Sequence, residues 1–282
     1  MRWLVTGSHG MLGQDVLAVL AGAGHEVTAT DRADLDICDA TAVEAAVAGH
    51  DVVLNCAAWT AVDDAESHEG DAFRVNAVGP AVLARAAAGH GARLVQVSTD
   101  YVLAGDGSAP YPEDSQRDPR SAYGRTKAAG EWAVAAEAPD HLVVRTAWLY
   151  GAGGPCFPRT IARIARERGG VDVVDDQVGQ PTWTVDVADL ILRLVVAGAP
   201  SGVYHATSSG QTSWFGFARA VVATAGLDPQ VVSPTTSVDF SRPAPRPAYS
   251  ALGHDRLRAV GVDPIGAWAD RWAVAGQRVL GG

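Results

Sequence analysis

Short runs of β-branched and apolar residues alternate with Ala-rich segments of helical spacing along the first half of the chain. The strand-like runs are Trp3–Thr6, His25–Thr30, Val52–Asn55, Leu94–Ser98 and Leu142–Thr146. The helical segments between them are Leu12–Ala21, Ala42–Ala48, Ala72–Ala88 and Ala122–Ala136. This rhythm is typical of a parallel sheet with helices on both faces. The sequence therefore predicts a doubly wound α/β fold.

After about residue 150 the rhythm breaks down and glycine and proline become frequent. Clusters of these residues occur at Gly151–Pro155, Gly198–Pro200 and Arg242–Pro247. Strand or helix character persists in Val171–Ala197 and Gly202–Ala206. We expect residues 1–150 to form the main domain, with 171–206 returning to it. Residues 151–170 and 207–282 would then form a smaller, interleaved domain.

The charge of the chain argues against a nucleic-acid partner. There are 32 acidic and 22 basic residues, a formal net charge of −10, and no run rich in Lys or Arg. The electrostatic footprint of a nucleic-acid binder is therefore missing, and a small-molecule ligand is expected. No apolar stretch approaches the ~20 residues that cross a bilayer, so we expect no membrane partner.

Cysteine and histidine usage predicts neither a disulfide framework nor a metal site. Cys38, Cys56 and Cys156 are far apart and lack C-x-x-C spacing, and the eight histidines show no ligand spacing. We expect no catalytic metal, and His205 is predicted to be a buried strand residue. The chain enters its first strand directly, without the features of a signal peptide. A cytoplasmic, reducing location is the resulting expectation.

A glycine turn joins the first predicted strand to the first predicted helix. Gly7, Gly10 and Gly13 have the spacing G-x-x-G-x-x-G, which differs from G-x-G-x-x-G but stands in the context of a dinucleotide fingerprint. Glycine permits the tight turn and lets backbone N–H groups approach a pyrophosphate at the positive end of the helix. The sequence predicts a Rossmann-type dinucleotide site that includes these glycines, Met11 and Leu12.

The second predicted strand ends in an acid followed by a base. Asp31 lies about 20 residues after the glycines, where an acid usually binds a ribose hydroxyl. Its charge favours NAD because it repels the 2′-phosphate of NADP. Arg32, however, is able to pair with that phosphate or stack on the adenine. Both are candidate cofactor ligands, and the choice between NADPH and NADH stays open.

A tyrosine and a lysine four residues apart open the helix that follows the fourth strand. Tyr123 and Lys127 share one helical face, and Thr99 ends the fourth strand at the carboxyl edge of the sheet, where ligands bind. Ketone reduction needs an acid that donates a proton as hydride arrives, and a nearby ammonium lowers the pKa of a phenol. We expect Tyr123 to donate, Lys127 to activate it and reach the nicotinamide ribose, and Thr99 to hold the carbonyl.

Lys127 is the only lysine in the chain, and the other 21 basic residues are arginine. The sequence thus uses Arg for every ordinary surface cation and keeps Lys at one position. At that position a compact ammonium with rotatable donors differs chemically from a planar guanidinium. This favours a functional role for Lys127 over a chance Y-x-x-x-K match.

With these residues in hand, the chain resembles the extended short-chain dehydrogenase/reductases and, within them, the dTDP-4-dehydrorhamnose reductase family, along nearly its whole length. The segments that carry the resemblance are Gly7–Gly13, Leu35–Ile37, Asn55–Asp63, Asn76, Ser98–Val102, Tyr123–Lys127, Arg145–Trp148 and Asp175–Thr182. The resemblance implies the catalytic set Thr99, Tyr123 and Lys127. It also implies hydride transfer from NADPH or NADH to C4 of a dTDP-linked 4-keto-6-deoxysugar, with dTDP-4-dehydro-L-rhamnose becoming dTDP-L-rhamnose.

The same resemblance implies binding residues beyond the catalytic set. Along the cofactor it places Asp36, Ile37, Ala57, Ala58, Thr60 and Asn76, together with the Tyr and Lys of the catalytic set. Against the substrate it places Val62, Asp100, Tyr123, Trp148 and Arg246. The arginine would lie near the diphosphate, where a bidentate cation makes physical sense. The smaller domain is accordingly expected to bind the substrate.

The chain departs from the family pattern at two places. Cys156 stands before Phe157 where the family usually has Asn, so a polar contact is lost there. Some family members dimerise through a magnesium ion held by surface glutamates, and Asp15 is the nearest candidate for such a ligand. A homodimer is therefore left open.

Several related activities compete with this interpretation. A sugar 4,6-dehydratase would carry Glu after Thr99 and Asp100, where this chain has Tyr101. A 4-epimerase shares the Tyr/Lys pair, and an epimerase-reductase adds Cys and His, so Cys156 leaves that option open. A reductase that makes another natural-product deoxysugar is the strongest rival. A non-catalytic nucleotide-binding subunit would be expected to lack part of the catalytic set, which is complete here.

Overall fold

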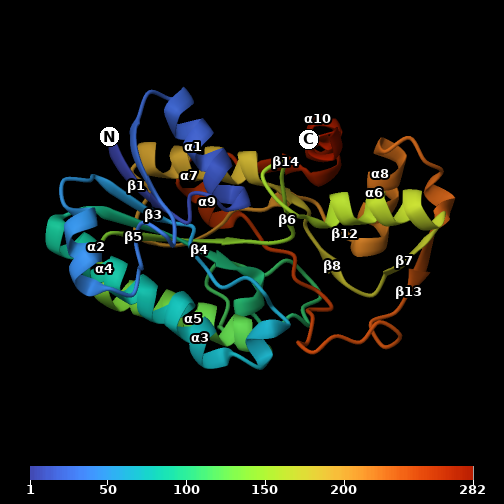
Figure 1. Ribbon diagram of the computed structural model, residues 1–282, viewed down its shortest axis with the longest axis horizontal. Helices are drawn as coiled ribbons and strands as arrows, with labels where there is room; N and C mark the ends of the chain where they lie inside the picture. Colours follow the sequence, from blue (N-terminus) through green and yellow to red (C-terminus); the bar gives the residue numbers. More distant parts are fainter. Residues whose placement is uncertain (282) are drawn as a thin grey trace.

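Six parallel strands form the central sheet, in the order β10-β5-β4-β3-β1-β2 (Figure 1). The structure is a computed structural model that describes residues 1–281. The strands are β1 (Arg2–Thr6), β2 (Glu26–Thr30), β3 (Val52–Asn55), β4 (Arg93–Thr99), β5 (His141–Thr146) and β10 (Gly202–His205). The strand order reverses between β1 and β3, which marks the ligand crevice of an open α/β sheet. The predicted Rossmann-type fold is confirmed.

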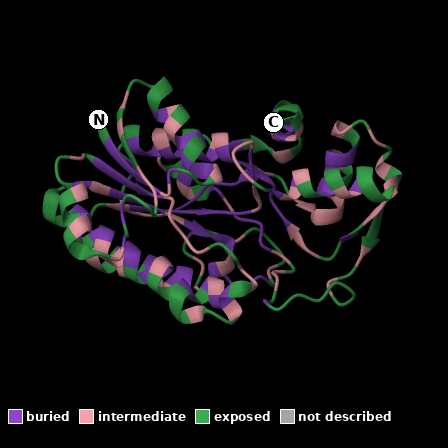
Figure 2. Cartoon of the chain, viewed as in Figure 1, coloured by how far each residue is buried: buried purple, intermediate pink, exposed green. Residues whose placement is uncertain are grey.

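Helices cover both faces of this sheet (Figure 1). One face carries α1 (Met11–Gly22) and α7 (Thr184–Val196); the other carries α2 (Ala40–Val47), α4 (Gly79–His90) and α5 (Ala122–Glu137). Strand side chains alternate between the two cores, because successive residues of a strand point to opposite faces. Trp3 and Val5 pack toward α1 and α7, whereas Leu4 packs toward the other three helices. The buried residues accordingly follow the strands in Figure 2.

A smaller region beyond the carboxyl edge of the sheet has its own core. Its helices are α6 (Phe157–Arg168), α8 (Trp214–Thr224) and α10 (Trp268–Gly281). Its strand pairs are β6 (Leu149–Tyr150) with β9 (Thr182–Trp183), β7 (Val171–Val174) with β13 (Val232–Thr235), β8 (Val178–Gly179) with β12 (Thr212–Ser213), and β11 (Ser208–Ser209) with β14 (Ile265–Ala267). Tyr150, Phe217 and Trp272 form the aromatic centre of this core.

The segment 171–206 divides between the two regions. Helix α7 and strand β10 lie with the main sheet, whereas β7 pairs with β13 of the smaller region. The expectation that the whole segment returns is therefore wrong for Val171–Val174, because this strand packs against the core of α6 and α8. The domain bounds as such stay a prediction.

The single helix predicted over Ala72–Ala88 is interrupted. It consists of α3 (Glu69–Phe73), a π-helical turn (Arg74–Val78) and α4. At this turn the carbonyl oxygen of Asn76 lies against Gly130 of α5, where a Cβ would not fit. Turns of this kind often mark functional sites.

No helix within residues 1–281 is long and apolar enough to cross a membrane. The longest described helix is α5, whose 16 residues carry charged side chains at several positions. The cytoplasmic location expected from the sequence stays a prediction.

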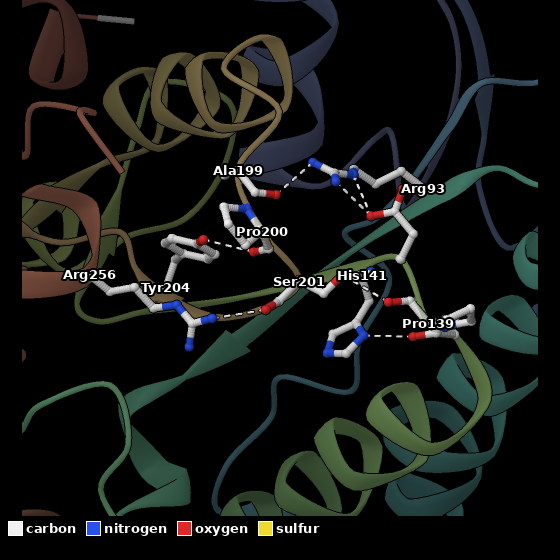
Figure 3. Close-up of polar contacts among 10 residues, drawn as sticks. Arg93, Pro139, His141, Ala199, Pro200, Ser201, Tyr204 and Arg256 are labelled. Carbon is white, nitrogen blue, oxygen red and sulfur yellow. Dashed lines mark hydrogen bonds and ion pairs between the residues drawn. The ribbon is translucent and has the colours of Figure 1, made fainter. Parts of the chain in front are cut away.

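A polar cluster at the amino-terminal edge of the sheet anchors β10 beside β5 (Figure 3). Ser201 Oγ donates to the Pro139 carbonyl at 2.8 Å and accepts from the His141 N–H at 3.2 Å. Arg256, in α9 (Asp255–Ala259), donates to the Ser201 carbonyl at 2.8 Å. Its guanidinium also lies 5.0 Å from the centre of the Tyr204 ring. One arginine thus secures both the turn before β10 and the strand itself.

Replacing this arginine should destabilise the fold. Arg256→Ala removes a hydrogen bond and a cation–π contact, so we expect the free energy of unfolding to fall by about 1–2 kcal/mol. Urea denaturation followed by circular dichroism measures this change. Arg258→Ala, two residues away, breaks only an exposed ion pair with Asp255 and should cost less than ~0.5 kcal/mol. Equal losses in both variants would contradict the anchoring role.

Candidate active site

The carboxyl ends of four parallel strands bring most of the predicted site residues to one edge of the sheet. Thr6 is in register with Asn55, and Asn55 with Gln96. Thr99, at the end of β4, is in register with Thr146 at the end of β5. The glycine turn after β1, the loop after β3 and the residues after β4 therefore lie next to one another, at the crevice marked by the strand order.

The glycine turn forms a cradle from which side chains are excluded. Gly7 has a φ of +67°, and a Cβ at this position would lie 2.6 Å from the Ala57 nitrogen. A Cβ on Gly13 would collide with the Gly7 carbonyl oxygen. Gly10 caps α1 without a side-chain hydrogen bond, and the first turn of α1 carries no acidic residue. The backbone N–H groups at the positive end of this helix are thus suited to a pyrophosphate, which fits a dinucleotide cofactor.

Asp31 ties the end of β2 to this cradle. Its Oδ2 accepts from the His9 N–H at 2.9 Å, and its Oδ1 accepts from the Arg32 N–H at 2.6 Å. The hydrogen bond from Arg32, assisted by that from His9, lowers the pKa of Asp31. Each oxygen retains a lone pair for a ribose hydroxyl. The Arg32 side chain is exposed, and no ion pair involving it is found in residues 1–281.

The loop after β3 is fixed from behind by two buried asparagines. Asn76 accepts from the Trp59 N–H at 2.8 Å and donates to the Trp59 carbonyl at 3.1 Å and to Thr126 Oγ1 at 3.0 Å. Asn55 accepts from the Ala57 N–H at 3.1 Å. Both amide hydrogens of Asn76 are used within the protein. The structure therefore places this predicted cofactor residue behind the loop that carries Ala57, Ala58 and Thr60.

Asp36 and Ile37 differ in what they present to a ligand. Asp36 is exposed and accepts from Arg74 Nη2 at 2.7 Å and from the Cys38 N–H at 2.9 Å. Ile37 is buried, and its side chain packs so closely on Gly79 that a Cβ there would lie 2.5 Å from Ile37 Cδ1. The side chain of Ile37 belongs to the core, so the predicted contact with an adenine would have to involve its backbone.

The start of α5 places Tyr123 over the end of β4. Ser121 caps this helix by accepting from the Gly124 N–H at 3.1 Å. Gly124 lies directly against the Tyr101 carbonyl oxygen, where a Cβ would collide. The rings of Tyr101 and Tyr123 consequently meet edge to face at 5.5 Å, and the Thr99 hydroxyl lies near Tyr123.

The electrostatics of Tyr123 differ from the expectation. Burial, followed by the charge of Asp100, raises the pKa of Tyr123, although the nearby Thr99 hydroxyl opposes the shift. Lys127 is buried and donates to the Val97 carbonyl at 2.7 Å; burial lowers the pKa of Lys127 to about 8. The pKa of Tyr123 is thus raised rather than lowered as expected, because burial and Asp100 outweigh any effect of the Lys127 ammonium. A phenol that stays protonated at neutral pH is the form that donates a proton to a ketone.

The chain belongs to a family whose model, described as the RmlD substrate binding domain, matches residues 1–279. It is 51% identical to the dTDP-4-dehydrorhamnose reductase of Streptomyces griseus, over 95% of this chain and 90% of that protein. It is 48% identical to the dTDP-4-keto-6-deoxy-D-glucose reductase of Streptomyces niveus, over 95% and 93%.

Solved structures agree with this assignment. The dTDP-4-dehydrorhamnose reductase of Bacillus anthracis in complex with NADP superposes with a TM-score of 0.93 at 34% identity, over 97% of this chain and 98% of that one. The enzyme class predicted from the sequence is confirmed: the chain is an NAD(P)-dependent oxidoreductase of the dTDP-4-dehydrorhamnose reductase type. The roles of its individual residues stay predictions.

Asp100 is a buried carboxyl next to the predicted proton donor. It is 2% exposed, and its Oδ1 accepts from Thr99 Oγ1 at 2.9 Å. Burial raises the pKa of Asp100 to about 6, although the hydroxyls of Ser250 and Thr99 oppose the shift. A buried carboxyl whose pKa is raised in this way is typical of a functional site.

Because the ionised form of Asp100 is destabilised by burial, we expect Asp100→Asn to stabilise the protein in a pH-dependent way. Because the folded state binds the proton more tightly, the contribution of Asp100 to stability is full below its usual pKa of 3.8 and is lost as the pH rises through about 6. Asparagine does not ionise, so the variant does not lose stability as the pH rises, and its amide oxygen still accepts a hydrogen bond from Thr99. Denaturation at pH 8 should show a gain of as much as about 3 kcal/mol that disappears toward pH 4. The exposed Asp172→Asn serves as control; a gain that does not vary with pH would refute the argument.

Sequence reasoning missed a buried ionic cluster beneath α5, the helix that carries Tyr123 and Lys127. Glu131 of α5 accepts from Arg145 at 2.8 and 2.9 Å and from Ser98 Oγ at 2.6 Å, and it pairs with Arg117. Burial raises the pKa of Glu131, but the two arginines and Ser98 hold it below its usual value. The available signal was its position four residues after Lys127, which puts both on one helical face.

The substrate residues proposed from the resemblance lie on separate segments. Trp148 follows β5, and Arg246 lies in the Pro-rich segment 242–247. Arg246 Nη2 donates to Asp63 Oδ1 at 2.9 Å, and this oxygen also accepts from the Ala244 N–H at 3.2 Å. Asp63 directly follows Val62 in the loop after β3. Its carboxylate therefore connects this loop to the Pro-rich segment. Arg246 also lines a small pocket together with Tyr101.

Three other residues named from the sequence lie away from this edge or inside a core. His205 is fully buried on β10, as predicted; burial and Arg145 lower its pKa to about 3. Cys156 is buried in the core of the smaller region, which does not favour an epimerase role. Asp15 is 9% exposed and hydrogen-bonded to Thr184. Asp15, the nearest candidate for the family's surface magnesium ligand, is therefore not a surface carboxylate.

Proposed function

We propose that this protein reduces the 4-keto group of a dTDP-linked 6-deoxysugar with NADPH or NADH, and that dTDP-4-dehydro-L-rhamnose is its substrate. The observation that carries the proposal is a protonated phenol, Tyr123, close to the Thr99 hydroxyl at the sheet edge that also carries the glycine cradle. The relatives named for reduction of dTDP-linked 4-ketosugars support the substrate class.

In such a reduction, each of the three predicted catalytic residues has a separate role. When substrate binds, the Thr99 hydroxyl turns its hydrogen from Asp100 to the ketone oxygen and orients the carbonyl toward the cofactor. When bound, the reduced nicotinamide supplies the hydride. Tyr123 donates its Oη proton to the same oxygen, so that no free alkoxide accumulates. The Lys127 ammonium, held at the Val97 carbonyl, stabilises the phenolate that this donation leaves behind.

The geometry around Arg32 favours NADPH over NADH. The Asp31 carboxylate is engaged by two backbone N–H groups, which offset part of its repulsion of a 2′-phosphate. Arg32 is exposed beside it and is able to pair with that phosphate in a bidentate manner. The NADP held by the Bacillus anthracis reductase agrees with this preference.

The direct test measures the decay of nicotinamide absorbance with purified protein and dTDP-4-dehydro-L-rhamnose made in situ. The sugar of the Streptomyces niveus relative, dTDP-4-keto-6-deoxy-D-glucose, is supplied in parallel. Faster oxidation with the first sugar supports the proposal, whereas faster oxidation with the second reassigns the substrate. If neither sugar leads to oxidation of the nicotinamide, despite intact cofactor binding, the proposed reaction is refuted.

Tyr123→Phe should abolish turnover without disturbing cofactor binding. Loss of a positioned acid typically costs about 10²–10⁴-fold in rate, and the remaining ring keeps its contact with Tyr101. The kcat and the Kd for NADPH, from absorbance and fluorescence titration, measure the two effects. Tyr101→Phe removes the neighbouring hydroxyl and should retain most of the turnover. An active Tyr123→Phe enzyme would remove this residue from the acid role.

Arg32→Gln should weaken the preference for NADPH. The loss of a charge-assisted bond to the 2′-phosphate should lower the ratio of kcat/KM for NADPH over NADH by roughly 10–100-fold. Steady-state kinetics with both cofactors measure the ratio. Arg85→Gln on α4, whose side chain pairs with Glu137, is the matched control and should leave the ratio unchanged. A ratio that does not move in the Arg32 variant contradicts the assignment.

A further inference from the structure

Trp148 has a backbone conformation that a bulky side chain rarely adopts. Its φ is +48°, and it is the only residue other than glycine with a positive φ in the described part of the chain. A residue held this way costs on the order of 1–3 kcal/mol and persists only when its surroundings over-determine it. Such residues cluster at ligand clamps and active sites. We therefore ask which contacts hold Trp148 in this conformation and where they place its indole.

Two residues of the smaller region fix the indole of Trp148. The Trp214 ring stacks on it with centroids 3.6 Å apart and planes 6° from parallel. Gly179 lies so close that a Cβ there would be 2.5 Å from Trp148 Cε2 and 2.7 Å from its Nε1. Phe157 in turn packs against Trp214 at 4.4 Å. The indole is thus held from two directions and has no room to change rotamer.

The backbone around this indole is equally constrained. The Trp148 carbonyl accepts from the Thr182 N–H at 3.2 Å. Trp214 begins α8, whose cap Ser213 pairs with Val178 in the β12–β8 ladder. The segment of Gly179 and the start of α8 are therefore one hydrogen-bonded unit. The positions of Trp148, Trp214 and Gly179 are therefore coupled to one another.

This fixed indole borders the predicted reaction centre. Thr146 ends β5 in register with Thr99, and Trp148 follows two residues later. On the other side, the Val178 carbonyl accepts from the Ser250 N–H at 2.9 Å. The hydroxyl of Ser250 is close enough to the Asp100 carboxylate to lower the pKa of Asp100. The indole is therefore connected on both sides to the residues expected to surround the ketone.

We propose that Trp214 and Gly179 are positioning residues that hold the Trp148 indole as a rigid wall of the sugar subsite. This wall decides which 4-ketosugar is accepted, an inference that rests on the proposed function. A mobile side chain adapts to either ring configuration of a sugar. A fixed aromatic face packs against the C–H face of one configuration and collides with the substituents of the other. Discrimination of this steric kind is worth about 10–200-fold.

Trp214→Leu tests the wall by removing the stacking partner while keeping Trp148. We expect the ratio of kcat/KM for dTDP-4-dehydro-L-rhamnose over dTDP-4-keto-6-deoxy-D-glucose to fall by about tenfold or more. The Kd for free dTDP, which lacks the sugar, should stay within about twofold. The exciton couplet that two parallel indoles produce in circular dichroism should disappear. A merely structural role would lower stability without changing the sugar ratio relative to dTDP affinity.

Matched variants separate positioning from general damage. Trp132→Leu changes a tryptophan of α5 that is 57% exposed and should leave all three measurements unchanged. Trp214→Phe keeps an aromatic ring for stacking and should restore most of the discrimination. If Trp214→Leu does not fold, Gly179→Ala displaces the indole from its other side and should lower the ratio in the same direction.

The outcomes distinguish the wall from the proposed function. Loss of the couplet with an unchanged sugar ratio would overturn the wall, as would an equal loss of affinity for dTDP alone. If the wild-type protein turns over neither sugar, the proposed function fails. The wall is then tested by binding, since Trp214→Leu must lower the affinity for dTDP-L-rhamnose relative to dTDP, and an unchanged ratio would overturn it.

Discussion

The ion pair between Glu131 and Arg145 is the contact on which the geometry of the site depends. Both side chains are at most 1% exposed, and a buried pair of this kind is tolerated only when its hydrogen bonds are satisfied. Here the carboxylate joins β5 through Arg145 and β4 through Ser98. The rotation of α5 over these strands is fixed by this contact. Tyr123 and Lys127, which lie about two turns and one turn before Glu131 respectively, are aligned with Thr99 as a result.

The parts of the fold that the sequence predicted are those with local, periodic signals. The glycine turn, the strand–helix alternation and the Tyr/Lys spacing each lie within one short segment, where backbone geometry dictates the arrangement. Contacts between distant segments gave no such signal. The stacking of Trp214 on Trp148 and the clasp of Asp63 on Arg246 depend on how the smaller region folds back. The pKa of Tyr123 was misjudged because it depends on burial and on Asp100, which spacing alone does not reveal.

The loop after β3 links the cofactor side of the site to the substrate side. At its beginning, Ala57 packs against Gly7 of the cradle. Toward its end, Asp63 holds Arg246 and the backbone of Ala244, while Asn76 fixes its middle. A displacement of this loop at one end is therefore transmitted to the other. The smaller region is accordingly coupled to the dinucleotide cradle through one short, well-anchored segment.

The presence of a single lysine gives the protein an unusual chemical surface. Every Lys or Arg side chain other than Lys127 is a guanidinium, so reagents that acylate primary amines have only the α-amino group and Lys127 to attack. Lys127 is buried, with a pKa of about 8, so a measurable fraction of it is the nucleophilic free base near neutral pH. Covalent labelling of its ε-amine would therefore report directly on access to the predicted catalytic centre, with the α-amino group as the one other primary amine.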